Sequence, residues 1–287
     1  MSVFHEPPIS AVREAVTRAL AEDLTPLGDL TSSILDPTAT TVARFVAREA
    51  GRLAGTACAT EAFGQLDSAI EVEWSAHDGD AIGVGTLIGV VHGRLIPVLI
   101  AERTALNFLG HLSGIATLTS KYVEAAARGG SARVWDTRKT TPGLRSLEKA
   151  AVRSGGGRNH RANLSDWVML KDNHLTGIGI TTAVARCLDL WPGRTIHVEC
   201  DHLSQMIEAI EAGATAVLLD NMSPDQVRHC VAEARRLALA GHRCLLEVSG
   251  GVTLETIGEF AGTGVDQISV GRLTSSAPVL DIGLDIA

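Results

Sequence analysis

Six short apolar runs recur through the second half of the chain, and each is followed by polar residues and then by a helical pattern. They are 132–136 (ARVWD), 167–171 (WVMLK), 196–200 (IHVEC), 216–220 (AVLLD), 244–248 (CLLEV) and 267–271 (QISVG). Alternating strand-like and helix-like segments predict parallel β/α units. Because the runs are nearly continuous in apolar residues, we expect a sheet that is buried on both faces.

Charged and glycine residues stand at the carboxyl end of nearly every run. They are Asp136 to Lys139, Lys171 to His174, Glu199, Asp220-Asn221, Glu247 with Ser249-Gly250-Gly251, and Gly271-Arg272. In a β/α barrel all these ends meet at one mouth, where barrel enzymes have their sites. An open doubly wound sheet brings together only the ends beside its switch point. The pattern favours the barrel.

The first half of the chain reads differently. We expect a helix over Ile9–Glu22 that Ser10 can cap, a strand over 41–47, and long helices over 99–129. The Gly-rich stretch 77–93 resembles the hammerhead folds of lipoyl- and biotinyl-carrier domains. Those domains present a modifiable Lys, and no Lys precedes Lys121 here, so only the scaffold is expected. We place a domain boundary near residue 115.

Composition excludes several classes of protein. The net charge of −8 and the pI of about 5.7 argue against a general nucleic-acid binder. The five Cys are scattered without a CxxC pair, which is typical of a reduced cytoplasmic protein with no disulfide framework. We expect no secretory signal, because the first residues lack its basic region and apolar run. We expect no membrane span, because no apolar run approaches the roughly 18 residues that it needs.

The segment from Asp136 to His174 concentrates positive charge inside this acidic chain. It holds five Arg and three Lys against four acidic residues, a net +4 in 39 residues. Such a segment must lie on a surface, pair internally or line a pocket for an anion, and the Gly and Pro within it argue against a solvated helix face. The pocket is the favoured interpretation.

Within this segment the cation types suggest the ligand. The candidates are Arg138, Lys139, His160, Arg161 and Lys171. Arg binds carboxylates through two parallel contacts, whereas Lys acts as a point charge suited to phosphate. The set therefore suits a ligand that carries both groups, with His160 as an orienting or a proton donor. For any single Arg the alternative is a surface ion pair.

Glycines after the last two runs suggest phosphate binding. Barrels often hold phosphate with these two loops, where bare backbone N–H groups can point at its oxygens. The candidates are Ser249, Gly250 and Gly271, and the alternative is ordinary turns.

Two carboxylates, Glu199 and Asp220, end adjacent runs. They could hold Mg²⁺, accept hydrogen bonds from sugar hydroxyls, or form structural ion pairs with Lys or Arg. His197 and Glu199 would point the same way on a strand, and His202 follows, but no further ligand stands at a recognisable zinc spacing, so a zinc site is not favoured. A satisfied core histidine is the favoured interpretation of His197.

Long blocks of the chain resemble the quinolinate phosphoribosyltransferase family from end to end. These blocks are 101–117 (AERTALNFLGHLSGIAT), 136–161 (DTRKTTPGLRSLEKAAVRSGGGRNHR), 169–174 (MLKDNH), 218–221 (LLDN) and 247–251 (EVSGG). The segments EDLTPLGDLTS and LDIGLDI are similar to the family's terminal elements.

The resemblance implies an α/β fold and an activity. It implies an N-terminal α/β sandwich (1–115) joined by the C-terminal tail (276–287), and an incomplete seven-stranded β/α barrel (116–275). The implied enzyme, a pentosyltransferase, condenses quinolinate with phosphoribosyl pyrophosphate in NAD biosynthesis. It releases CO₂ and pyrophosphate, requires Mg²⁺, and acts as a homodimer or higher homo-oligomer with shared active sites. No nucleic-acid or membrane partner is expected.

Site residues carry over motif by motif. The resemblance assigns Arg103, Arg138, His160 and Arg161 to quinolinate, with Arg103 entering the partner subunit's site. Lys139, Lys171, Glu199 and Asp220 are the expected catalytic residues, with Glu199 and Asp220 on the ribose hydroxyls or Mg²⁺. Ser249, Gly250 and Gly271 are expected to receive phosphate.

One departure and two rival functions remain. The family's usual Gly, Leu, Thr, His, Ser run is replaced here by Gly271 to Ser276, with an added Arg272 and no His. The rivals are a paralogous phosphoribosyltransferase for another pyridine or azole acid and a non-catalytic phosphosugar-binding barrel. The retained Arg set argues against the first, because a monocarboxylate would leave an Arg unpaired. The retained Lys and carboxylates argue against the second.

Overall fold

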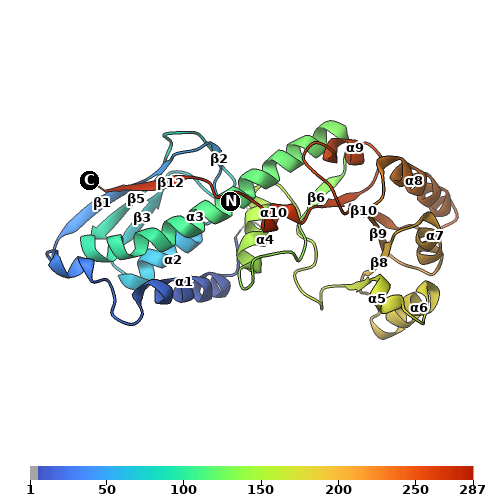
Figure 1. Cartoon of the computed structure of the whole chain (residues 1–287), viewed down its shortest axis with the longest axis horizontal. Helices are drawn as coiled ribbons and strands as arrows, with labels where there is room; N and C mark the ends of the chain where they lie inside the picture. The colour runs from blue at the N-terminus through green and yellow to red at the C-terminus, as the bar shows by residue number, and fades with distance from the viewer. Residues whose placement is uncertain (1–5, 287) are drawn as a thin grey trace. The chain divides into compact units, whose positions relative to one another are not determined.

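The computed structural model describes residues 6–286 and is an α/β protein (Figure 1). Its internal contacts divide the chain into two compact units. The first comprises the residues up to Ser120, the segment Lys139–Gly156 and the residues from Arg272 on. The second comprises Lys121–Arg138 and Gly157–Gly271. The boundary near residue 115 stays a prediction, and helix α3 runs through it.

The first unit is built on a four-stranded antiparallel sheet of order β12-β1-β5-β3. Its strands are β1 (Thr40–Ala47), β3 (Glu71–Trp74), β5 (Leu87–Arg94) and β12 (Ile282–Ile286), and a separate pair joins β2 (Gly51–Arg52) to β4 (Ala81–Ile82). The helical elements of this unit are α1 (Ile9–Leu24), η1 (Thr31–Ile34), α2 (Thr56–Leu66), the first part of α3 (Leu95–Gly129), α4 (Arg145–Ser154) and α10 (Arg272–Ser275).

A small aromatic cluster joins this sheet to a helix. The Phe45 ring of β1 stacks on Trp74 of β3, with centroids 5.2 Å apart, and meets Phe63 of α2 edge-on at 6.1 Å. Because aromatics are scarce in this chain, Ala, Val and Leu supply most of the remaining core.

The end of the chain returns to the first unit. Strand β12 pairs with β1, and the tail before it crosses α3 so closely that a Cβ on Gly114 would lie 1.9 Å from the Pro278 carbonyl oxygen. Only glycine permits this approach of backbone to backbone.

Predictions for the first half are mostly confirmed. The helix over Ile9–Glu22 is α1, the strand over 41–47 is β1, and the long helices over 99–129 are one continuous helix, α3. The predicted capping role of Ser10 is wrong, because Ser10 lies inside the helix. The helix begins at Ile9, and its N-cap is Pro8, which forms no side-chain capping hydrogen bond.

The second unit contains a six-stranded parallel sheet of order β6-β11-β10-β9-β8-β7. Its strands are β6 (Arg133–Trp135), β7 (Val168–Leu170), β8 (Ile196–Cys200), β9 (Ala216–Asp220), β10 (Leu245–Ser249) and β11 (Gln267–Ser269). Its helices are the end of α3, α5 (Asp172–Leu175), α6 (Ile180–Leu190), α7 (Leu203–Glu211), α8 (Pro224–Leu239) and α9 (Ile257–Ala261). The six strands lie within the six apolar runs, with β10 alone ending one residue later, at Ser249, so the β/α prediction is confirmed.

A seventh position exists beside β6. Arg158 forms an isolated parallel bridge with Trp135, and the backbone N–H groups of Arg158 and Asp136 donate to the carbonyls of Val134 and Arg158. Among the described residues no ladder joins β6 to β7, so the barrel is open. The incomplete barrel is therefore present, with six strands in ladders and a single residue in the place of the seventh.

The register gives the two faces of this sheet different chemistry. One face presents apolar residues such as Val198, Leu219 and Val248, all fully buried. The other carries Lys171, Glu199, Asp220, Glu247 and Ser249, because residues paired in a parallel sheet point the same way and alternate along each strand. The expectation of a sheet buried on both faces is confirmed within the strands, because His197 and Glu247 on the polar face are as buried as the apolar residues on the opposite face.

None of the helices in the described part of the chain combines the length and apolar character needed to cross a membrane.

Candidate active site

Four predicted side chains stand at the carboxyl ends of neighbouring strands on the polar face. Lys171 directly follows β7, Glu199 lies near the end of β8, and Asp220 and Ser249 end β9 and β10. Ser249 is in register with Asp220, and Glu199 is in register with Leu218, two residues before Asp220 on the same face. Carboxyl ends of barrel strands are where catalytic residues gather, so the fold brings these four together.

Lys171 and Glu199 form an ion pair between adjacent strands. Glu199 is half-buried, and its carboxylate is thus held in place rather than free to rotate. A structural ion pair was one of the three roles that the sequence allowed for Glu199. The contact with Lys171 is made by one carboxylate oxygen, Oε2. Next to it, the Asp220 carboxylate accepts a hydrogen bond of 2.7 Å from the Asn221 side-chain amide.

The loop after β10 meets the loop after β9 at very short range. Gly250 and Gly251 have φ of 87° and 63°, the left-handed region that favours glycine. The Asn221 backbone N–H donates to the Ser249 carbonyl at 3.0 Å, and a Cβ on Gly250 would lie 2.2 Å from Asn221 Oδ1. Gly250 is therefore required by backbone conformation and by contact. Gly271 lies two residues beyond β11 in the same unit.

Arg161, which follows the Arg158 bridge, and Arg138 form a cluster of positive charge that we call the positive pole. Arg161 is only 9% exposed, and Arg138 follows β6 in the same unit. Burial of the guanidinium, and then the nearby charge of Arg138, lower the pKa of Arg161, while Asp166 acts in the opposite direction. Arg161 is buried and Arg138 is exposed, and two positive charges this close together favour an anion beside them.

The backbone of this pole is anchored by a fully buried carboxylate. Asp136 accepts hydrogen bonds from the backbone N–H of His160 at 2.8 Å and from the Asn159 side-chain amide at 2.7 Å. The Gly155-Gly156-Gly157 turn before it lets the chain return beside β6. His160 and Arg161 are thus held by tertiary contacts rather than by secondary structure.

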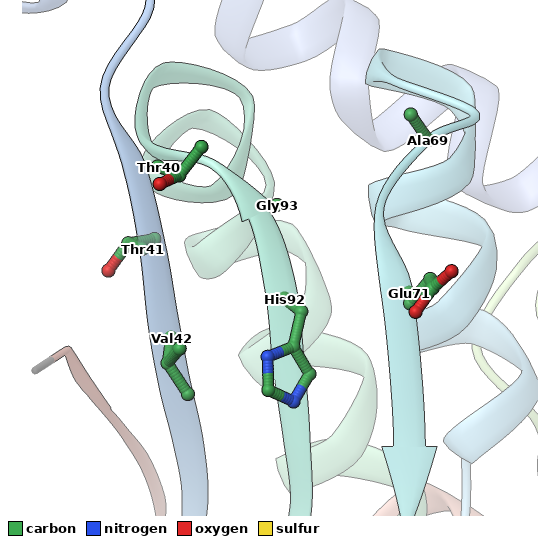
Figure 2. Close-up of a pocket in the computed structure, with 7 residues that line it drawn as sticks. All are labelled: Thr40, Thr41, Val42, Ala69, Glu71, His92 and Gly93. Carbon is green, nitrogen blue, oxygen red and sulfur yellow. The ribbon is translucent and has the colours of Figure 1, made fainter.

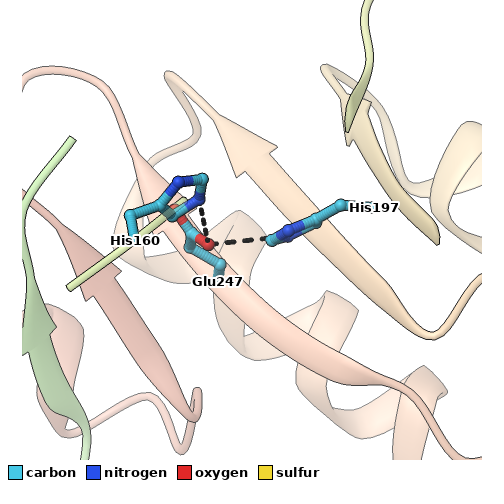
Figure 3. Close-up of side chains that lie close together, drawn as sticks. All are labelled: His160, His197 and Glu247. Carbon is cyan, nitrogen blue, oxygen red and sulfur yellow. Dashed lines mark ion pairs between the residues drawn. The ribbon is translucent and has the colours of Figure 1, made fainter. Parts of the chain in front are cut away.

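Below the strand ends lies a cluster that we call the buried triad, made of His160, His197 and Glu247 (Figure 3). Glu247 Oε2 lies 3.4 Å from His160 Nε2 and 3.5 Å from His197 Nε2. Burial lowers the pKa of His197 to about 4 and outweighs the Glu247 carboxylate, which raises it. Burial would raise the pKa of Glu247, but contacts with the two His and with Ser269 together hold it below its usual value.

The sequence named each member of the buried triad without joining them. His197 was assigned to the core, which its 2% exposure confirms, and Glu247 was counted among the strand-end charges. One signal could have linked two of them to the site. His197 stands two residues before Glu199, and Glu247 stands two residues before Ser249, so each points to the same face as that strand-end residue.

Two predicted site residues belong to the first unit. Arg103 is exposed on α3 and lines a hollow of about 530 Å³ together with residues 279–282 of the tail. Lys139 is exposed, and its carbonyl accepts a 2.7 Å hydrogen bond from the Thr274 hydroxyl. Thr274 belongs to the stretch that departs from the family pattern, so part of that stretch fixes the Lys139 loop.

A second hollow, of about 560 Å³, lies on the sheet of the first unit (Figure 2). Glu71 on β3 and His92 on β5 face it from paired positions, together with Thr40, Thr41 and Val42 of β1. Its lining contains neither Arg nor Lys, so it does not resemble the anion site.

The fold and the strand-end residues together define a β/α-barrel protein with charged side chains gathered at the carboxyl ends of its strands. Comparison with known proteins makes this specific. The family model described as quinolinate phosphoribosyl transferase, C-terminal domain, matches residues 115–285, and the N-terminal domain model matches residues 29–113. The chain belongs to the quinolinate phosphoribosyltransferase family.

Individual relatives agree along nearly the whole length. A probable nicotinate-nucleotide pyrophosphorylase (carboxylating) from Bacillus subtilis (strain 168) is 41% identical and aligns over 90% of this chain and 88% of its own. The Mycobacterium leprae nicotinate-nucleotide pyrophosphorylase (carboxylating) is 40% identical over 96% of this chain and 97% of its own. A solved nicotinate-nucleotide pyrophosphorylase from Francisella tularensis superposes with a TM-score of 0.93 at 36% identity, covering 100% of both chains.

Proposed function

We propose that this protein is a pentosyltransferase of de novo NAD biosynthesis. It condenses quinolinate with phosphoribosyl pyrophosphate and gives nicotinate mononucleotide, CO₂ and pyrophosphate. The observation that carries this proposal is the buried Arg161 beside Arg138. A buried guanidinium beside a second, exposed positive charge favours an anionic ligand, and a dicarboxylate can offer one carboxylate to each of the two Arg side chains.

Quinolinate has adjacent carboxylates at positions 2 and 3 of a pyridine ring. Arg138, His160 and Arg161 bind them, and Arg103 of a partner subunit completes the set. A monocarboxylic pyridine or azole acid offers a carboxylate to only one of these Arg side chains, so the paralogous function is not favoured.

The phosphoribosyl substrate binds at the strand ends. Backbone N–H groups of Gly250 and Gly271 and the Ser249 hydroxyl receive phosphate, and Lys139 and Lys171 neutralise its charge. Because the left-handed Gly250 has no Cβ, its backbone can approach the phosphate oxygens. A barrel that only binds a phosphosugar is not favoured, because it would not need the Arg138, His160 and Arg161 side chains that are proposed to bind a dicarboxylate.

The reaction needs no protein nucleophile. As the bond from ribose C1 to pyrophosphate breaks, C1 gains oxocarbenium character, and the nearby carboxylates of Glu199 and Asp220 stabilise this positive charge. The quinolinate nitrogen donates its electron pair to C1 and becomes cationic. The electron pair of the bond to the 2-carboxylate then stays on ring carbon C2 as CO₂ leaves, and C2 takes up a proton. Positioning and electrostatics supply most of the rate enhancement.

Mg²⁺ is part of the proposal, held by Glu199 and Asp220. Hard oxygen donors are the ligands that this ion prefers, and the two carboxylates stand at the ends of adjacent strands on one face, so the donor set fits. When bound, the ion would screen the charge of the pyrophosphate leaving group. Lys171 shares Glu199 and holds it in position.

We further propose a homodimer or higher homo-oligomer, a cytoplasmic location and active sites shared between subunits. The supporting observation is that Arg103 is exposed on α3, where it can reach a second copy.

The test is direct. The purified protein is incubated with quinolinate, phosphoribosyl pyrophosphate and Mg²⁺, and the mononucleotide and CO₂ are measured with and without EDTA. Mononucleotide and CO₂ in equal amounts, abolished by EDTA, are expected. Product from nicotinate instead of quinolinate would favour the paralogue, and binding of the phosphoribosyl substrate without turnover would favour the binding barrel.

A further inference from the structure

We propose that Glu247 is a positioning residue that fixes the His160 imidazole for quinolinate binding. This inference rests on the proposed function, because it takes His160 as a quinolinate ligand. Glu247 acts through His160 and touches neither substrate itself.

The geometry of the buried triad supports this role. Glu247 projects from β10 and is 1% exposed, while His160 comes from the loop beside β6 and is 8% exposed. Figure 3 shows both imidazoles turned toward the single carboxylate between them. Trp167 packs edge-on against the His160 ring with centroids 4.8 Å apart. The ring is therefore bounded by a carboxylate on one side and by an indole on another.

The backbone and the side chain of His160 are fixed by different groups. Asp136 holds the backbone N–H, and the bridge at Arg158 holds the chain before it. Neither sets the side-chain torsions of His160. The Glu247 carboxylate lies 3.4 Å from the ring nitrogen Nε2, so it acts on the side-chain orientation, which the backbone contacts do not reach.

Stability alone does not require a carboxylate here. Replacing a buried ion pair by apolar side chains of similar volume is often neutral or stabilising, because desolvation offsets the attraction. The opposite face of the same strand is filled by Leu246 and Val248, both buried. Glu247 instead places a carboxylate on the polar face, against the His160 side chain. A contact that orients a ligand-binding side chain needs such a group.

The orientation of the His160 ring matters because an imidazole forms hydrogen bonds only along the directions of its two ring nitrogens. A carboxylate beside Nε2 fixes which way the ring points, and with it the direction in which Nδ1 points. Loss of the carboxylate lets the ring rotate and lose its alignment with a ligand carboxylate. The expected signature is weaker quinolinate binding with little change for the phosphoribosyl substrate.

The experiment compares Glu247→Gln with the wild type and with a matched exposed change, Glu259→Gln on α9 of the same unit. The KM for each substrate, kcat, and the Kd for quinolinate by calorimetry are measured. We expect Glu247→Gln to raise the quinolinate KM and Kd about tenfold, with the KM for phosphoribosyl pyrophosphate unchanged. Glu259→Gln should match the wild type.

A double-mutant cycle separates positioning from a structural effect. If Glu247 acts through His160, adding Glu247→Gln to His160→Gln should change the quinolinate Kd no further. Equal effects of Glu247→Gln with and without His160 would overturn the proposal, as would an unchanged quinolinate Kd in the single variant. A wild type that binds quinolinate but turns nothing over would count against the proposed reaction and leave this binding test intact; if quinolinate is not bound at all, both proposals fall.

The same three side chains could instead hold a metal, because their ligand atoms all lie within 4.8 Å of one another. Elemental analysis of the purified protein decides this. One equivalent of a transition metal, lost in Glu247→Gln, would replace the positioning role by metal binding.

Discussion

The His197 imidazole should make the protein less stable in mild acid. Its pKa falls from 6.5 to about 4, chiefly because burial disfavours the charged ring. Above pH 6.5 the ring is neutral in both folded and unfolded chains, so it contributes no pH dependence. As pH falls below 6.5, the unfolded chain takes up a proton that the folded chain excludes until about pH 4, so stability falls across this window.

The size of this effect follows from the two pKa values. At pH 5 the unfolded imidazole is almost fully protonated and the folded one is almost fully neutral, which costs about 2 kcal/mol relative to pH 7.5. For a chain of 287 residues that corresponds to a fall in Tm of roughly 3 °C. His197→Asn removes the titrating group and should remove this part of the slope, whatever it does to stability at neutral pH.

Thermal unfolding is followed by circular dichroism at pH 7.5 and pH 5 in EDTA, so that bound metal does not contribute. His242→Gln serves as the control, because this imidazole is exposed and its loss should leave the slope unchanged. An equal fall in Tm between the two pH values in wild type and His197→Asn would refute the reasoning.

Three further outcomes are expected. Arg161→Ala should weaken quinolinate binding about 100-fold, because the buried guanidinium is proposed to bind the dicarboxylate. The Kd for phosphoribosyl pyrophosphate, measured by calorimetry like that for quinolinate, should stay within about twofold. An equal loss of affinity for both substrates would contradict this assignment. Gly250→Ala should lower stability by about 1–3 kcal/mol more than Gly251→Ala in urea unfolding, because both have positive φ but only a Cβ at Gly250 would meet Asn221. Mixing inactive Arg103→Ala with inactive Lys139→Ala subunits should restore part of the activity, and verified mixed dimers without any rescue would count against shared sites.

Much of the fold was predictable, because its signals are local. Each strand of the parallel sheet lies, to within one residue, inside an apolar run that can be read from a few consecutive residues. The strand-end positions of Lys171, Glu199, Asp220 and Ser249 follow from the same runs. The Ser10 cap failed because several starts of one helix are nearly equivalent in sequence, and neighbouring contacts select among them.

The seventh strand position could not be predicted. It is one residue, Arg158, in a Gly-rich segment without a strand-like pattern, and it pairs because Trp135 happens to lie beside it in space. The face to which each strand-end polar side chain points follows from the alternation along its strand, but the neighbouring strand, and so the side chain that it meets, does not.

The sequence by itself determined the family, the order of β/α units and the residues available to bind an anion. Those properties depend on residue types and on spacing along the chain. Only the tertiary structure decided that His160, His197 and Glu247 share one buried carboxylate contact, and that Arg161 is buried near Arg138. These groups come from segments far apart in sequence, and the register of neighbouring strands, which no local pattern encodes, sets which of them meet.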